Sequence, residues 1–302
     1  VSCSGFVVKA GTRDELDNEQ GLAHFTEHML FKGTPSRSSN NILNFMDKVG
    51  GEVNAYTTKE EIFLFSVFLR KDYERAIALM SDQFFNSDFP ADEIDKEREV
   101  IMDEIDSYED SPSELIFDDF EQLLFPNHPV GRRILGTEQC LAGITRKDFI
   151  DFHARNFTTD SIVYYSQSAM PMNNVVRLAE KYLGGIKASF RQGGGFAGNT
   201  VPVAARGVRK TIDKDTHQAH VIIGNTNFSL FEEEDRMCMY FINNILGGPG
   251  MNSRLNMALR EKSALVYSVE SGVTSFTDSG VFTVYFGTDT EHVNKSLKIV
   301  EK

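Results

Sequence analysis

The feature that most constrains the fold is a weak internal repeat with a spacing of 216 to 219 residues. His24–Leu30 aligns with Tyr240–Leu246 at an offset of 216, and Ile62–Val67 falls on Val281–Phe286 at an offset of 219. Two matches at nearly the same offset predict a duplicated unit that contains both helix and strand. On this reading the second copy is truncated near its midpoint, and about 100 further residues would be needed to complete it.

Local patterns predict an α+β fold for the repeated unit. Runs of β-branched and aromatic residues predict strands at 5–10 and 161–167 and a hairpin within 52–69. The expected helices are 20–31, 39–48, 72–86, 91–107, 112–124, 145–155 and 172–183. The glycine-rich stretch 191–205 has no periodicity and predicts a linker. We therefore expect three parts: a first half at 1–190, the linker, and a second half at 206–302.

Charge and cysteine content narrow the class of protein. The 302 residues include 31 Lys and Arg against 44 Asp and Glu, a net charge of -13, which makes nucleic acid an unfavourable partner. The longest apolar run, Ile62–Leu69, is too short for a membrane span. Three widely spaced cysteines, Cys3, Cys140 and Cys238, favour a reducing compartment such as the cytoplasm. Because the chain begins at Val1, a targeting peptide could precede it, and the localisation stays open.

The strongest chemical signal is the HxxEH pattern formed by residues 24–28. His24 and His28 are four residues apart, so a helix presents both rings on one face, at a spacing that suits one metal ion. Glu27 lies near enough to that face to reach a water molecule held there. The pattern is the inverted form of the HExxH signature of zinc proteases.

A catalytic zinc ion needs a third protein ligand, and the acidic segment 91–107 offers candidates. Glu97, Ile101 and Glu104 recur at i, i+4 and i+7, so both carboxylates share a stripe with an apolar residue. Burying an unpaired carboxylate is unfavourable, and a metal ion would relieve that cost. Periodicity alone leaves both Glu97 and Glu104 as candidates.

These residues carry a resemblance to a known family. HFTEHMLFKGT, GGEVNAYT and KEREVIMDEI, with 75 residues between His28 and Glu104, resemble the pitrilysin/insulinase family of zinc metallopeptidases. Within the family the chain is most similar to bacterial members that resemble the β subunit of the mitochondrial processing peptidase. The resemblance implies two homologous αβ-roll halves of the processing-peptidase/LuxS-like metallohydrolase type. Each half would contain an antiparallel sheet covered by helices.

The resemblance also implies a role for each residue that matches the family motifs. His24, His28 and Glu104 would bind one Zn²⁺ per chain, Glu27 would be the general base, and Glu97 would support the site without binding the metal. Residues 1–190 would then be the catalytic, zinc-binding half. Asn54 and Ala55 would form the edge strand that takes an extended peptide, and Arg260 and Tyr267 in the second half would contact the substrate carbonyl.

The implied function is a zinc endopeptidase that cleaves unstructured peptides or presequences. A homodimer, or a heterodimer with a related subunit, is an expected assembly, because the family contains both as well as single chains. Two alternatives stay open: a peptide-binding partner subunit of a processing-peptidase heterodimer, and a structural or assembly subunit that resembles the core proteins of a respiratory complex. The intact HxxEH pattern and Glu104 argue against the partner subunit, which would not need Glu27 if it had given up catalysis.

Plainer interpretations exist for several of these residues. The two histidines could be surface polar residues, the acidic stripe could be a solvated helix face, Arg260 could be a surface charge and Tyr267 a core aromatic. His217 and His220 suggest a second metal site, but the segment resembles a strand, on which residues three apart face opposite ways.

Overall fold

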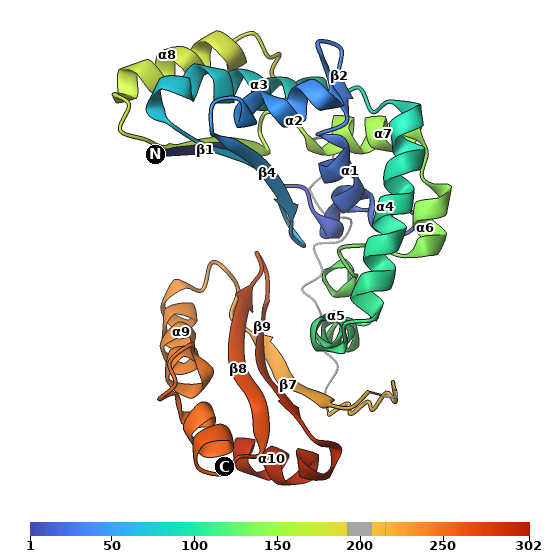
Figure 1. Cartoon of the computed structure of the whole chain (residues 1–302), viewed down its shortest axis with the longest axis vertical. Helices are drawn as coiled ribbons and strands as arrows, with labels where there is room; N and C mark the ends of the chain where they lie inside the picture. Colours follow the sequence, from blue (N-terminus) through green and yellow to red (C-terminus); the bar gives the residue numbers. More distant parts are fainter. Residues whose placement is uncertain (192–206, 215) are drawn as a thin grey trace. The chain divides into compact units, whose positions relative to one another are not determined.

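The computed structural model describes residues 1–191, 207–214 and 216–302 (Figure 1). It divides into two compact units, the first made of residues 1–106 and 132–198 and the second of 107–131 and 199–302. The predicted linker at 191–205 lies outside the described residues, apart from Arg191. The segment 107–131 groups with the second unit, whereas the sequence placed it in the first half.

The first unit is built on a four-stranded antiparallel sheet. Its strand order is β4 (Glu52–Thr57), β5 (Ile62–Phe68), β1 (Ser2–Val8) and β6 (Ile162–Gln167), which leaves β4 at one edge. The predicted hairpin within 52–69 is therefore confirmed as β4 and β5, paired from Glu52 with Val67 to Thr57 with Ile62.

Helices cover one face of this sheet, because alternate residues of each strand point toward it. Phe6 and Val8 of β1 and Ile62 and Leu64 of β5 are fully buried on that face. The helices of this part of the chain are α1 (Leu22–Met29), α2 (Ser39–Asp47), α3 (Tyr73–Asn86), α4 (Ala91–Glu109), α6 (Glu138–Gly143), α7 (Arg146–Asn156) and α8 (Met172–Leu183).

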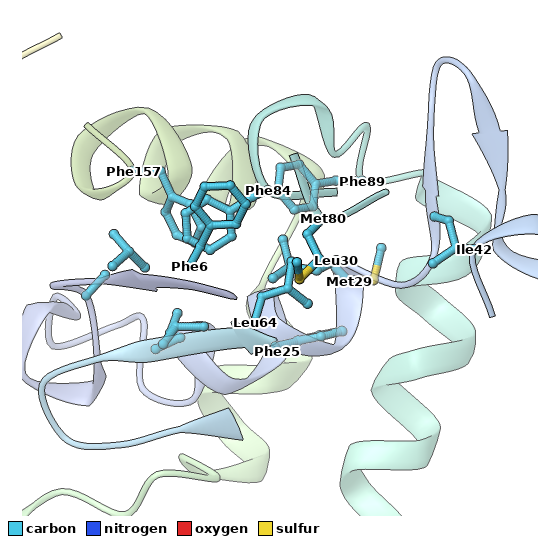
Figure 2. Packing of buried hydrophobic residues seen from close by; sticks show 14 of the residues in the cluster. Phe6, Phe25, Met29, Leu30, Ile42, Leu64, Met80, Phe84, Phe89 and Phe157 are labelled. Atoms are coloured by element: carbon cyan, nitrogen blue, oxygen red, sulfur yellow. The ribbon is translucent and has the colours of Figure 1, made fainter. Parts of the chain in front are cut away.

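Aromatic side chains join the sheet to these helices. Figure 2 shows Phe6 of β1 close to Phe84 of α3 and Phe157. The ring centroid of Phe84 is 5.0 Å from that of Phe6 and 4.9 Å from that of Phe157. Phe25 of α1 meets Phe149 of α7 edge-on at 4.8 Å. Such aromatic contacts stabilise the fold beyond the burial of apolar area alone. The side chains belong to one continuous core, which holds α1 between the sheet and α7.

The second unit is built on a three-stranded antiparallel sheet in the order β7 (Ala219–Asn227), β9 (Gly280–Thr288) and β8 (Val266–Ser275). Helix α9 (Glu233–Gly247) packs against β8, and α10 (Val293–Val300) follows β9. The repeat predicted from sequence thus matches a helix at Tyr240–Leu246 and a strand at Val281–Phe286.

Helix α5 (Pro112–Leu124) explains why 107–131 belongs to the second unit. It packs on β7, and its Phe117 ring lies 5.3 Å from that of Tyr285 on β9. Leu124 and Phe125 form a small cluster with Val281.

Both units combine helices with an antiparallel sheet, which confirms the α+β class. Among the residues with described positions, no helix has the length and apolar composition that a membrane span requires.

Candidate metal centre and active site

The start of α1 is fixed by a buried carboxylate. Gly21 precedes the helix with φ +93°, and a Cβ there would come within 2.6 Å of the carbonyl oxygen of Leu135, so glycine is required on both counts. Glu15 Oε1 accepts the backbone N–H of Gly21 at 3.1 Å and that of Ala23 at 2.8 Å. The first turn of α1 therefore has its free amides satisfied immediately before His24.

Two histidines of α1 and one carboxylate of α4 lie together. The rings of His24 and His28 are 4.5 Å apart, and Glu104 Oε2 lies 3.9 Å from His24 Nε2 and 3.8 Å from His28 Nε2. One ligand atom from each residue lies within 4.8 Å of the other two. Within the part of the chain that the structure describes, this is the one such group of His, Cys, Asp and Glu residues.

These separations and donor types fit a zinc ion. Ligand atoms about 2.0–2.2 Å from one tetrahedral ion lie roughly 3.3–3.6 Å apart, slightly closer than the nitrogens and oxygen are here. Two imidazoles and one carboxylate are also a donor set typical of catalytic zinc. Glu104 keeps 45% of its side chain exposed, so the group is accessible from one side.

Burial keeps the first histidine neutral. Its burial, and to a lesser extent the neighbouring His28, lower the pKa of His24 to about 3. His24 Nδ1 is buried without a hydrogen-bond partner among the described residues, while Nε2 faces Glu104. A neutral imidazole with a free lone pair is the form that binds a metal.

Glu97 lies beside the group and orients the second histidine. Its Oε1 is 2.9 Å from His28 Nδ1, and its other oxygen pairs with Lys32. A carboxylate on the distal nitrogen fixes the ring and directs Nε2 toward the metal position. Burial, which the helical stripe does not reveal, separates the two candidates: Glu97 is buried and Glu104 is exposed. The expected cost of burying a carboxylate therefore applies to Glu97, and it was wrong for Glu104.

Glu27 lies on the same helix with a separate set of partners. Thr57 Oγ1 of β4 donates a hydrogen bond of 2.6 Å to Glu27 Oε2. Burial raises the pKa of Glu27, the Thr57 hydrogen bond and His28 oppose that rise, and Glu104 adds to it. A carboxylate with a raised pKa beside a metal position suits proton transfer near neutral pH.

Asn54 and Ala55 lie on β4, the edge strand of the sheet. The Ala55 N–H is bonded to its neighbour's side-chain oxygen, Asn54 Oδ1, at 2.8 Å rather than to β5. The Thr58 N–H donates to the carbonyl of Glu61 at 2.8 Å, so these two residues form a hydrogen-bonded pair. Because hydrogen-bonded and non-hydrogen-bonded pairs alternate along an antiparallel ladder, the N–H and C=O of Ala55 point away from β5, toward the open edge. This edge can accept a further strand once the Asn54 side chain moves.

Arg260 and Tyr267 belong to the second unit. Arg260 lies in a π-helical turn, Asn256–Glu261, and its guanidinium is 4.0 Å from the Glu261 carboxylate. Tyr267 is the second residue of β8, is 57% exposed, and donates a hydrogen bond of 3.0 Å to Asp289. Both side chains are thus accessible polar groups, and Tyr267 is not the core aromatic that the plainer interpretation expects.

The remaining histidines do not form a second group of ligands in the described residues. His217 precedes β7 instead of lying within a strand, which corrects one step of the sequence argument. His220 contacts Tyr285 through a 2.8 Å hydrogen bond.

Two supporting residues were missed from the sequence: Lys32, which pairs with Glu97, and Thr57, which bonds Glu27. A signal for Thr57 was present. Strand alternation puts it on the same face as Val53 and Ala55, which pack against the core below α1.

The fold brings together a group of residues that could hold a metal ion, and comparison with known proteins identifies the family. The insulinase family, peptidase family M16, matches residues 1–138, and the inactive domain of peptidase M16 matches residues 143–302. The chain belongs to this family, which confirms the prediction made from its motifs.

Curated relatives are named as zinc proteases. The chain is 32% identical over 298 residues to the uncharacterized zinc protease YmxG of Bacillus subtilis, covering 99% of this chain and 71% of that protein. It is 34% identical over 281 residues to the uncharacterized zinc protease Rv2782c of Mycobacterium tuberculosis, covering 93% of this chain and 64% of that one.

Solved structures share the fold. A peptidase M16 inactive domain from Pseudomonas fluorescens aligns with a TM-score of 0.88 at 20% identity, over 99% of this chain and 72% of that one. A protease from Helicobacter pylori aligns with a TM-score of 0.89 at 21% identity, over 99% and 73%.

Proposed function

We propose that the protein is a zinc endopeptidase that hydrolyses extended, unstructured peptides such as presequences. The observation that carries the proposal is the cluster on α1 and α4, in which His24, His28 and Glu104 bring three ligand atoms within 4.8 Å of one another beside Glu27. Zinc protease relatives of similar sequence support the choice of metal.

His24, His28 and Glu104 would hold one Zn²⁺ per chain. When bound, the ion supplies a Lewis acid that makes a water molecule more acidic and polarises the peptide carbonyl. The protein contributes the geometry: a neutral His24, a His28 ring oriented by Glu97, and a Glu104 carboxylate that stays accessible.

Glu27 would act as the general base and then as the general acid. Its carboxylate takes a proton from the attacking water and delivers it to the leaving amine as the peptide bond breaks. The residue Glu27 is 9% exposed, so few water molecules compete for its carboxylate. The rise in pKa that burial causes brings the group closer to the range in which it can both accept and donate a proton.

The edge of β4 would bind the substrate. An extended peptide can add to this edge through backbone hydrogen bonds, which do not depend on side-chain identity. Ala55 offers its N–H and C=O there, and Asn54 occupies the amide until the peptide replaces it. Arg260 and Tyr267 are proposed, from the family resemblance, as further donors to the substrate carbonyl.

The test combines metal analysis with peptide cleavage. The full-length protein, purified without chelator, should contain about one zinc per chain and cleave a mixed peptide pool. Glu27→Gln should retain the zinc and lose cleavage by about 10²- to 10⁴-fold, because the amide cannot accept the proton.

Glu104→Gln serves as the contrast, because it should weaken zinc binding itself. A metal content near zero after reconstitution would refute the proposal. Zinc binding and peptide binding without cleavage would instead favour the partner-subunit alternative.

A further inference from the structure

A single side-chain hydrogen bond joins the proposed general base to the proposed substrate-binding strand. Thr57 is the last residue of β4, two residues after Ala55, and its hydroxyl donates to Glu27 Oε2 at 2.6 Å. Among the described residues, it is the one hydrogen-bond partner recorded for the Glu27 carboxylate.

The direction of the Thr57 side chain follows from the strand. Successive side chains of β4 alternate between exposed and half-buried, and Val53, Ala55 and Thr57 share the half-buried face. Helix α1 packs against β4 on this face, so the hydroxyl at the end of the strand meets the carboxylate at Glu27.

The end of β4 is held in place from both sides. The turn that follows is closed by Thr58, whose N–H donates to Glu61 at 2.8 Å and whose hydroxyl accepts the Glu61 N–H at 2.9 Å. The Arg13 N–H donates to the carbonyl of Lys59 at 2.8 Å, and the Lys59 ammonium bonds the carbonyl of Arg132. Thr57 therefore offers its hydroxyl from a fixed backbone.

We propose that Thr57 is a positioning residue that orients Glu27 for proton transfer and ties that orientation to the strand that binds peptide. The inference rests on the proposed peptidase function. The hydroxyl occupies one oxygen of the carboxylate and restricts rotation of the side chain. The other oxygen is then left to accept the proton from water and return it to the amine.

The size of the effect follows from the type of bond. Loss of a hydrogen bond to an ionised group can lower a rate by about 10- to 100-fold. Thr57→Val removes the hydroxyl and keeps the shape and the β-branched character that suits a strand. We expect kcat to fall by this factor while KM and zinc content stay unchanged, because neither the metal ligands nor the backbone edge is altered.

Thr57→Ser, which keeps the hydroxyl, should recover most of the lost kcat. The matched control is Thr26→Val, the same substitution on α1 at a buried hydroxyl that has no hydrogen-bond partner in the described residues. It should leave kcat unchanged. Thr57→Ala provides a second variant without the hydroxyl if Thr57→Val fails to fold, as judged by its thermal transition.

A double variant separates positioning from substrate binding. If Thr57 acts through Glu27, then adding Thr57→Val to Glu27→Gln should cost no further activity. In the same Glu27→Gln background, the affinity for a non-cleaved peptide should not change.

Wild-type kcat in both Thr57→Val and Thr57→Ala would overturn the inference, as would failure of Thr57→Ser to recover activity. A loss of peptide affinity in the Glu27→Gln background would also overturn it, because Thr57 would then bind substrate directly. If the wild-type protein cleaves no peptide, the proposed function fails first, and the role of Thr57 with it.

Discussion

Removing the Glu97 carboxylate should weaken zinc binding without removing a ligand. Glu97 is 6% exposed, bonds His28 Nδ1 at 2.9 Å and pairs with Lys32. Loss of such a carboxylate behind a histidine ligand typically lowers metal affinity by about 10- to 100-fold, or roughly 1.4–2.8 kcal/mol. The loss of zinc affinity in Glu97→Ala should be near the upper end of this range, because the variant also leaves the partly buried ammonium of Lys32 without its carboxylate. Glu97→Gln keeps an acceptor for His28, so its loss of zinc affinity should be near the lower end.

Competition with a chelator of known zinc affinity measures this difference directly. Glu99→Gln is the matched control, since Glu99 is an exposed residue of the same helix and the overall charge changes equally. Its zinc affinity should equal that of the wild type. Wild-type affinity in Glu97→Ala would refute the reasoning, because the hydrogen bond to His28 would then contribute nothing to metal binding.

Three further predictions concern the support of α1 and its surroundings. Phe25→Ala should destabilise the first unit by about 3–5 kcal/mol in chemical denaturation, since the ring is fully buried against Phe149. Glu15→Ala should cost about 1–3 kcal/mol for each of the two amides that it leaves unpaired, and Glu15→Gln should cost less. Burial lowers the pKa of His153, so as the pH falls through about 6.5 the unfolded chain binds this proton more readily than the folded chain does. Tm should therefore fall between pH 7 and pH 5, and less so in His153→Gln; an equal fall in both would contradict this.

The parts of the site that share one helix could be predicted from sequence. His24, Glu27 and His28 depend only on the geometry of α1, and helical spacing fixes which of them share a face. The same helical spacing places Glu97 and Glu104 on one stripe of α4. It could not tell them apart, because their surroundings come from α1 and from solvent, and only the structure shows one buried and the other exposed.

Helix α5 marks the limit of the repeat argument for the fold. Its existence and bounds follow from apolar periodicity, but its place does not. Phe117 packs on Tyr285, a residue more than a hundred positions later in the sequence. Because the linker composition was used to divide the chain, α5 was assigned to the first half. The apolar face of α5 is instead buried in the second unit.

Lys32 and Thr57 show why the residues that orient a site are harder to predict than those that do its chemistry. A metal ligand or general base is restricted to a few residue types at a fixed spacing, so pattern and chemistry identify it together. A positioning residue needs only one donor at the right point in space, and many residue types supply one. Thr57 and Glu27 are 30 residues apart and meet because β4 forms the sheet edge beneath α1. The link between base and strand is thus a property of the tertiary fold, and substitutions that shift β4 relative to α1 should impair proton transfer even when every metal ligand is intact.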